Sequence, residues 1–253
     1  MKLGASLTFD NARIGIDTNT IVEAARSVET IGYDGLWVYD CIGRNETIPD
    51  PLVLLGIIGA TTDAISIGTG IIQLPLRNTA ILAHQILTAH LVCGDRLRLG
   101  VGFGSTRVDF ETVGYDFDQR KQYFLEQIPI LKALLTTGKC GSIKLSPWPL
   151  RKNAPPLLLG TWGKHIKTAA LKFDGWIASG FYRNNLELAK SLAKYRSVGG
   201  KNALVTNVAY DPKSGVTPVI DRLLNLKEIG FDEAIVFAPI DALCAIKEGV
   251  RND

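Results

Sequence analysis

Apolar, β-branched runs recur along the chain at intervals of about thirty residues. The clearest two cover residues 65–74 and 97–104, and each ends in glycine or proline. Continuous apolar runs of this kind are typical of parallel strands that are buried on both faces. We therefore predict eight strands, over residues 2–9, 35–40, 65–74, 97–104, 156–161, 175–180, 204–210 and 233–239.

Segments with helical periodicity lie between these runs. Asp50 and Pro51 supply a cap and a first-turn proline for one of them, and Gly94 is a stop signal for the next. The pattern predicts eight helices, over residues 18–31, 50–62, 81–92, 118–135, 165–173, 185–197, 216–229 and 242–248.

Strict alternation of eight strands and eight helices in 253 residues predicts one domain, 1–253, with the α/β fold of a (β/α)8 TIM barrel. A doubly wound open sheet is the alternative, but no early GxGxxG opens a helix. Residues 136–155 break the regular spacing, and we expect them to form an ordered excursion over one barrel face.

Composition narrows the possible partners and location. Lys and Arg together number 28 against 25 for Asp and Glu, and they are scattered, so nucleic acid is not expected as a partner. The four cysteines lie far apart without a CxxC pair, which indicates neither a metal site nor a disulfide framework and favours a reducing cytoplasm. Asp10 interrupts the apolar start, so we expect a first strand there, with no signal sequence and no membrane span.

Several motifs occur in a fixed order along nearly the whole chain. They are GYDGLWVYD from Gly32, GTG from Gly68 with a following Arg77, GDR from Gly94 with LGVGFG after it, PPLLLGTWG from Pro155, and FDGW from Phe173. With these motifs the chain resembles the luciferase-like flavin-dependent oxidoreductases, which include bacterial luciferase, alkane monooxygenases and coenzyme F420-dependent reductases. The resemblance implies a barrel with a flavin in the mouth at the carboxyl ends of the strands.

The resemblance also implies which strand ends meet the flavin. Gly70–Ile71 aligns with a non-proline cis peptide that bulges against the flavin ring in this family. The residues expected at the cofactor here are Thr69, Gly70, Ile71, Gly102 and Gly104. The alternative is that these glycines only make room for barrel packing or a barrel corner.

The loop after the fifth predicted strand is the candidate phosphate site. It comprises Gly160, Thr161, Trp162, Gly163 and Lys164 and leads into a helix, so its amides can converge on an anion. A helix cap with an exposed lysine is the simpler alternative. An unrelated barrel enzyme that binds a phosphorylated metabolite would use the same loop without a flavin.

Three residues are candidates for acid–base work. Asp40 and Cys41 end the second strand, where many relatives carry a histidine, and Asp109 stands where many carry a glutamate. A thiol is a weak donor near neutral pH, so Cys41 replaces an imidazole poorly, and a buried structural thiol is an equal alternative. Asp109 is also suited to a structural cap. The histidines are His84 and His90 on an outer helix and His165, for which phosphate contact or exposure is expected.

The resemblance implies an oxidoreductase in which reduced flavin activates O₂ or passes a hydride to a small organic substrate. We expect FMN, with F420 as the alternative, and a separate flavin reductase is a possible partner. The missing histidine leaves a noncatalytic flavin-binding protein as a second hypothesis.

A homodimer is expected from the resemblance, and apolar helix faces in the second and third βα units are candidates for its contact. Phe103, Trp162, Trp176 and Phe181 are aromatic candidates for lining the pocket, with a place in the core as the alternative for each.

Overall fold

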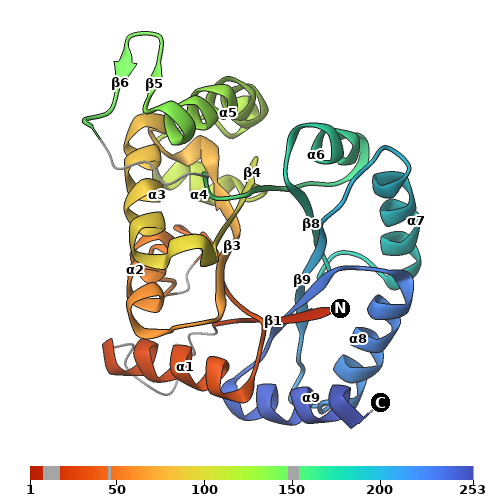
Figure 1. Cartoon of the computed structure of the whole chain (residues 1–253). Helices are drawn as coiled ribbons and strands as arrows, with labels where there is room; N and C mark the ends of the chain where they lie inside the picture. The colour runs from red at the N-terminus through yellow and green to blue at the C-terminus, as the bar shows by residue number, and fades with distance from the viewer. Residues whose placement is uncertain (8–17, 45–46, 148–153, 253) are drawn as a thin grey trace.

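Eight parallel strands close into a barrel in the computed structural model, which describes residues 1–7, 18–44, 47–147 and 154–252. Around the barrel the order is β1-β10-β9-β8-β7-β4-β3-β2, so the predicted TIM barrel is confirmed and the open-sheet alternative is wrong (Figure 1). The strands are β1 (Lys2–Ser6), β2 (Gly35–Val38), β3 (Ser66–Gln73), β4 (Leu97–Gly102), β7 (Leu157–Gly160), β8 (Gly175–Ser179), β9 (Ala203–Ala209) and β10 (Glu233–Phe237).

Helices surround the barrel, as predicted. Asp50 caps the second helix by accepting from the amide of Leu52 at 2.8 Å, with Pro51 in the first turn. Gly94 ends the third helix at φ 65°, a conformation that glycine adopts freely. The helices are α1 (Thr18–Ile31), α2 (Pro51–Thr61), α3 (Thr79–Cys93), α4 (Arg107–Thr112), α5 (Arg120–Thr137), α6 (Ile166–Lys172), α7 (Asn185–Arg196), α8 (Thr217–Ile229) and α9 (Ile240–Asn252).

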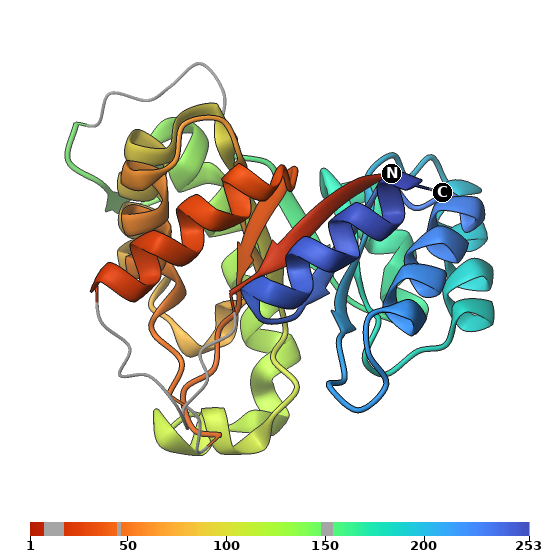
Figure 2. The same ribbon diagram turned by 90° about the horizontal axis from the view of Figure 1, so that it is seen from below.

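The connection between α5 and β7 contains a short hairpin. Its strands β5 (Lys139–Cys140) and β6 (Ile143–Lys144) are antiparallel, and the hairpin projects beyond α3 and α5 (Figure 1). Figure 2 places it at the end of the barrel where the termini lie, while the segment that follows β4 lies at the opposite end. The excursion therefore leaves the mouth uncovered by its described part; residues 148–153 lie outside the described residues.

The side chain of Trp37 fills the half of the barrel interior that is nearer the amino ends of the strands. Trp37 packs with an inner cluster of Leu158, Ile177, Leu204 and Ile235. Its indole is accommodated because the facing positions of β1, β2 and β3 are glycine: a Cβ atom at Gly68 would lie 2.4 Å from Trp37 Cζ3. Trp37 Nε1 donates to Glu233 Oε1 at 2.8 Å, and Arg98 forms an ion pair with the same carboxylate. This end of the interior is therefore closed by side chains.

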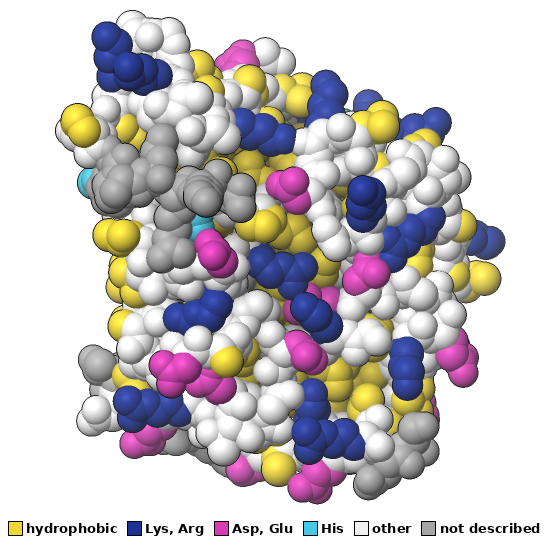
Figure 3. All heavy atoms as spheres, in the orientation of Figure 1, with side chains coloured by type: hydrophobic (Ala, Val, Ile, Leu, Met, Phe, Trp, Pro, Cys, Tyr) yellow, Lys and Arg dark blue, Asp and Glu magenta, His cyan; other side chains and the backbone are white. Residues whose placement is uncertain are grey.

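Aspartates cap the amino ends of the strands. Asp34, Asp174 and Asp232 accept hydrogen bonds from the amides of Leu3 (2.8 Å), Leu157 (2.8 Å) and Ala203 (2.6 Å), respectively. Figure 3 looks onto this end, where acidic and basic side chains surround a hollow of about 800 Å³. Because the acids here bind strand amides or form ion pairs, this end stabilises the barrel, as is usual for the fold.

No helix among the described residues is both long and apolar enough to cross a membrane. The four cysteines are free thiols, of which Cys41 and Cys93 are buried.

Candidate functional site

Strand β3 carries a bulge at the mouth of the barrel. Thr69 pairs with Leu99 and Ile72 with Val101, so three steps along β3 match two along β4. The extra residue falls at Gly70–Ile71, whose peptide bond is cis. This confirms the cis peptide that the sequence motif implied. A bulge of this kind turns the backbone toward the space above the strands.

The side chain of Ile71 occupies the space next to three glycines. Cβ atoms built at Gly100, Gly102 and Gly160 would approach Ile71 carbons to 3.2, 2.9 and 2.6 Å. Ile71 also packs on the inner cluster around Trp37. The close approach at Gly102 and Gly160 is therefore made by a side chain of this protein, and Ile71 forms the floor of the mouth.

Gly104 has a different neighbour. Its φ is 80°, and a Cβ atom there would lie 2.7 Å from Phe110 Cε2 and 2.9 Å from Gln73 Oε1. Only glycine meets both requirements without strain. This residue thus lets the loop after β4 lie over Gln73.

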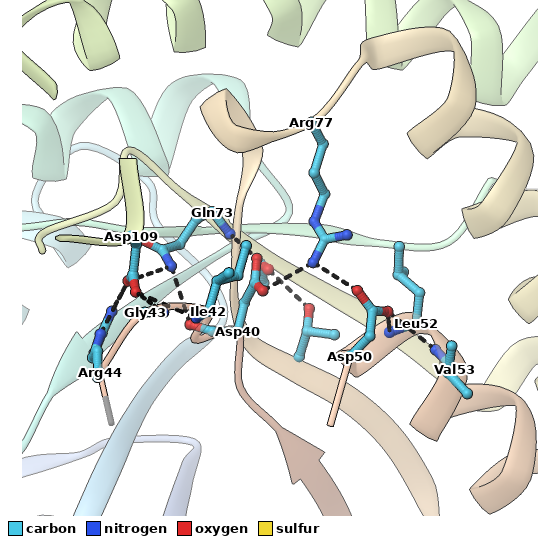
Figure 4. Close-up of polar contacts among 12 residues, drawn as sticks. Asp40, Ile42, Gly43, Arg44, Asp50, Leu52, Val53, Gln73, Arg77 and Asp109 are labelled. Atoms are coloured by element: carbon cyan, nitrogen blue, oxygen red, sulfur yellow. Dashed lines mark hydrogen bonds and ion pairs between the residues drawn. The ribbon is translucent and has the colours of Figure 1, made fainter. Parts of the chain in front are cut away.

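Asp40 is held in a buried ion pair at the end of β2 (Figure 4). Its carboxylate accepts from Arg77 Nη2 at 2.9 Å and from the amide of Gln73 at 3.0 Å, while Arg77 also contacts Asp50 at 3.0 Å. Burial raises the pKa of Asp40, and the pair with Arg77 offsets this rise only in part. The Asp40 amide donates to the carbonyl of Ile71 at 3.3 Å, which places this group beside the β3 bulge.

Asp109 is fully buried in α4 and joins that helix to the loop after β2 (Figure 4). It accepts from Arg44 Nη2 at 2.6 Å, from the amide of Gly43 at 3.0 Å and from Gln73 Nε2 at 2.9 Å. Burial acts to raise the pKa of Asp109, but the hydrogen bonds from Arg44, Gly43 and Gln73 outweigh it and lower the pKa. Asp109 is therefore ionised near neutral pH.

Gln73 connects the two carboxylates. Its Nε2 donates to Asp109 and, at 3.2 Å, to the carbonyl oxygen of Asp40. Asp40 and Asp109 thus lie in one network through Gln73, and the buried thiol of Cys41 follows Asp40 directly in the chain. Whether they transfer protons remains a prediction.

The predicted phosphate loop leads from β7 into α6 through a short turn, Gly163–His165. Gly163 has φ 63°, and no atom lies within 4 Å of a Cβ built there, so its surroundings are open. His165 Nε2 is buried without a hydrogen-bond partner among the described residues. Burial lowers the pKa of His165, and so do the charges of Lys164 and Lys121. An open backbone, an orphaned ring nitrogen and two nearby lysines fit a bound anion such as a phosphate.

The aromatic candidates separate into core and rim. Trp176 is fully buried, and its Nε1 donates to the carbonyl of Thr161 at 2.9 Å. Phe103 packs on His165 with ring centroids 5.1 Å apart, and Arg183 lies 4.6 Å from the ring centroid of Trp162. Phe181 is 69% exposed beside a hollow of about 740 Å³ between the loop after β8 and α8. Only Trp176 is a core residue.

Sequence reasoning did not single out Gln73, Arg44 or Asn207. Gln73 and Asn207 interrupt apolar strands at their carboxyl halves, and that polar interruption is a usable signal. Arg44 lies in an irregular loop, where no periodicity marks it. His84 and His90 lie on α3, one of the outer helices, as predicted.

Comparison with known proteins gives a consistent result. The model of the family described as luciferase-like monooxygenase matches residues 1–210. An uncharacterized protein of Mycobacterium tuberculosis is 30% identical over 201 residues, which cover 75% of this chain and 70% of that protein. The 4-hydroxyprotoasukamycin monooxygenase of Streptomyces nodosus subsp. asukaensis is 28% identical over 116 residues, 46% of this chain and 31% of its own length.

Solved structures share the barrel. An F420-dependent secondary alcohol dehydrogenase in complex with an F420-acetone adduct superposes with a TM-score of 0.79 at 16% identity, covering 99% of each chain. The oxygenating constituent of 3,6-diketocamphane monooxygenase of Pseudomonas putida, in complex with FMN, gives 0.69 at 17% identity over 91% of this chain and 72% of that one. At these identities the likeness shows the fold alone.

Proposed function

Because the chain belongs to the luciferase-like monooxygenase family, we propose that it is a flavin-dependent oxidoreductase whose cofactor lies in the mouth of the barrel. The observation that carries this proposal is the β3 bulge at Gly70–Ile71, which presents backbone above the Ile71 floor. When bound, the flavin would supply hydride transfer or O₂ activation. The protein's part is to bind, orient and shield it.

The loop after β7 is suited to hold the phosphate of the cofactor. We assign this role to the backbone of Gly160, Trp162 and Gly163, the Thr161 hydroxyl and the Lys164 ammonium group. The open surroundings of Gly163 and the proximity of Lys164 and Lys121 to His165 support the assignment. Thr69 is placed differently: it is fully buried, and its hydroxyl donates to the carbonyl of Gly100 at 2.8 Å, so it supports the bulge from below.

Asp40 is the proposed proton-holding group. It is buried beside the bulge, and its raised pKa favours the protonated carboxyl more than in water. Asp109 stays ionised and orients Gln73 and the loop after β2. Cys41, the buried residue after Asp40, remains a candidate for a weaker donor role.

We favour reduced FMN as the cofactor, with O₂ as oxidant and a small organic substrate, and keep F420-dependent hydride transfer as the alternative. Relatives in this fold include proteins described with FMN and with F420. A separate reductase would supply reduced FMN. We also propose a cytoplasmic location, because the cysteines are free thiols.

The deciding experiment is a titration of the purified apoprotein with oxidised FMN, reduced FMN and F420, followed by flavin fluorescence and, for reduced FMN, by calorimetry under nitrogen. Saturable binding of one compound names the cofactor. Binding of none, with the circular dichroism of a folded barrel, contradicts the proposal and favours a barrel that binds a phosphorylated metabolite, which sugar phosphates then test.

A second measurement separates an enzyme from a flavin carrier. The protein loaded with reduced FMN is mixed with O₂ and a panel of small ketones, aldehydes and alkanes, and substrate-dependent product is measured by mass spectrometry. Product formation supports the oxidoreductase. Tight flavin binding without any product across the panel favours the noncatalytic flavin-binding protein.

A further inference from the structure

Strand β9 carries a second bulge at the mouth. Val205 pairs with Ala234 and Val208 with Val236, so three steps along β9 match two along β10. The residues inside the bulge are Thr206 and Asn207. Strand β9 therefore has one extra residue in its carboxyl half, as β3 has at its cis peptide.

The two bulges face each other across the barrel. In the strand order β9 and β3 are four positions apart, which is the diametrically opposite place in an eight-stranded barrel. Thr206 reaches the β3 bulge, because its Cγ2 atom would lie 3.2 Å from a Cβ built at Gly70. Asn207 comes one residue later in β9, nearer the carboxyl end. It thus lies at the level of the mouth, above the Thr206 contact.

The change of register turns Asn207 toward the inside. Leu204 belongs to the inner cluster and Val205 to the outer core, as regular alternation requires. Thr206 points inward to Gly70, yet Val208 again belongs to the outer core. Strict alternation would place Val208 on the inner side, so β9 contains one extra residue between Thr206 and Val208. The two residues of a bulge point to the same side of the strand. Asn207 therefore shares the inner side with Thr206.

The backbone of Asn207 is unusual. Its φ is 57°, and it is the sole non-glycine residue with positive φ among those the structure describes. Asparagine tolerates this left-handed conformation better than most residues, but glycine adopts it at no steric cost. A sequence that needed only the bulge would be served best by glycine. The backbone conformation therefore does not by itself require the carboxamide side chain.

No hydrogen bond to the Asn207 carboxamide occurs among the described residues, although the side chain is half-buried. A half-buried amide offers two donors and one acceptor to whatever occupies the mouth. Together with the β3 bulge on the opposite side of the barrel, these observations indicate that the Asn207 carboxamide faces a ligand.

We propose that the Asn207 carboxamide hydrogen-bonds the ring system of the flavin that lies on the Gly70–Ile71 bulge, an inference that rests on the proposed function. A flavin ring exposes alternating carbonyl and N–H groups along its polar edge, and a carboxamide pairs with such an edge by donating and accepting at once. Asn207 is thus a positioning group for the cofactor, opposite the bulge that supports the ring.

The test compares two glycine variants in the same strand region. Asn207→Gly keeps the positive φ and removes the carboxamide, so the Tm should be unchanged or higher, while FMN affinity falls about five- to tenfold, the effect of one hydrogen bond. Asn202→Gly removes an amino-end contact, in which Asn202 Nδ2 donates to the carbonyl of Asp174 at 2.7 Å. This control should lower the Tm and leave FMN affinity unchanged.

Affinities are measured by fluorescence and calorimetry with FMN, and with F420 if the wild type prefers it. Asn207→Asp keeps the size of the side chain but loses both donors, so it should bind at least as weakly as the glycine variant. Equal affinity of wild type and Asn207→Gly overturns this inference alone. A folded wild type that binds neither cofactor overturns the proposed function and this inference together.

Discussion

Two aspartates at the mouth, Asp40 in the loop after β2 and Asp109 in α4, show how the surroundings of a carboxyl group set its pKa. Both Asp40 and Asp109 are buried, and each faces an arginine. Asp109 receives enough hydrogen bonds to lower its pKa, whereas for Asp40 the cost of burial prevails and its pKa is raised. Gln73 Nε2 donates to the carboxylate of Asp109 and to the backbone carbonyl of Asp40, which fixes the orientation of its side-chain amide. One network thus holds an ionised carboxylate and a carboxyl that retains a proton more readily.

Replacing Asp109 with Asn should destabilise the protein by about 2 to 3 kcal/mol, because the donors of Arg44 and Gly43 lose a buried charged acceptor. The free energy of unfolding in urea at pH 7 measures this loss. Since the folded-state pKa of Asp109 is lowered, its stabilising contribution is present above about pH 4 and is lost as the pH falls through the folded-state value. The difference between wild type and variant should therefore shrink at lower pH.

Asp118→Asn is the matched control for this prediction. Asp118 pairs with Arg107 at 3.1 Å, but both side chains are more than half exposed. Its loss should change the stability by no more than about 0.5 kcal/mol. Equal effects of the two substitutions would show that the Asp109 pair contributes no more than a surface ion pair.

At the scale of elements, glycines determine which segments approach closely. Gly100 on β4 lies against the β3 bulge, where a Cβ atom would be 2.1 Å from the carbonyl oxygen of Thr69. Gly56 on α2 has no atom within 4 Å of the same position. Packing thus requires glycine at position 100 on β4, whereas it does not require glycine at position 56 on α2.

Alanine substitutions at these two glycines should have opposite effects. Gly100→Ala should lower the free energy of unfolding by about 2 to 3 kcal/mol or prevent folding, since the obstructing atom belongs to the backbone. Gly56→Ala should raise it by about 0.5 to 1 kcal/mol through the better helix propensity of alanine. Denaturant melts of both variants check the pair, and a tolerated Gly100→Ala contradicts the tight β3–β4 contact.

The order of the elements was predictable from the sequence because parallel barrel strands are continuous apolar runs with clear ends. Predicted β3 and β8 begin or end within one residue of the observed strands, and α1 has the predicted bounds. Helix α4 was missed because six residues are too few for a periodic signal. The hairpin β5–β6 was missed for the same reason.

The candidate site was predictable in place but not in detail. Motif resemblance located the cis peptide at Gly70–Ile71, and strand ends located Asp40 and Asp109. Spacing cannot reveal which side chain fills the space beside a glycine, so the packing of Ile71 on Gly102 and Gly160 was not foreseen. The Asn207 conformation depends on a bulge in the β9–β10 register, which hydrophobic periodicity does not encode.

At the scale of the whole molecule, α2 and α3 form an uncharged face. They pack side by side, and neither contains Asp, Glu, Lys or Arg (Figure 1). Val53, Ile81 and Leu91 on these helices are 63%, 60% and 52% exposed. We propose that a second copy covers this face about a twofold axis, because an apolar and uncharged face is complementary to itself.

Ile81→Asp should convert such a dimer to a monomer, since the dimer would bury two unpaired carboxylates near each other. Sedimentation velocity at micromolar concentration should show half the wild-type mass. Leu171→Asp is the control, because Leu171 is 69% exposed on α6, outside the proposed face. A wild type that sediments as a monomer, or a variant that keeps the dimer, contradicts the proposed contact.

The seam between β1 and β10 has a consequence for how the chain reaches its fold. Lys2 pairs with Glu233, Trp37 Nε1 donates to Glu233, and the Tyr33 hydroxyl donates to the carbonyl of Leu243 at 2.9 Å. These contacts join residues about two hundred positions apart, so their loop-closure entropy is large and the contact order of the seam is high. During synthesis, β1 cannot reach its partner until β10 has left the ribosome. The nascent chain therefore carries an unpaired β1 edge until β10 has been synthesised, and chaperone binding at that edge would protect it from aggregation.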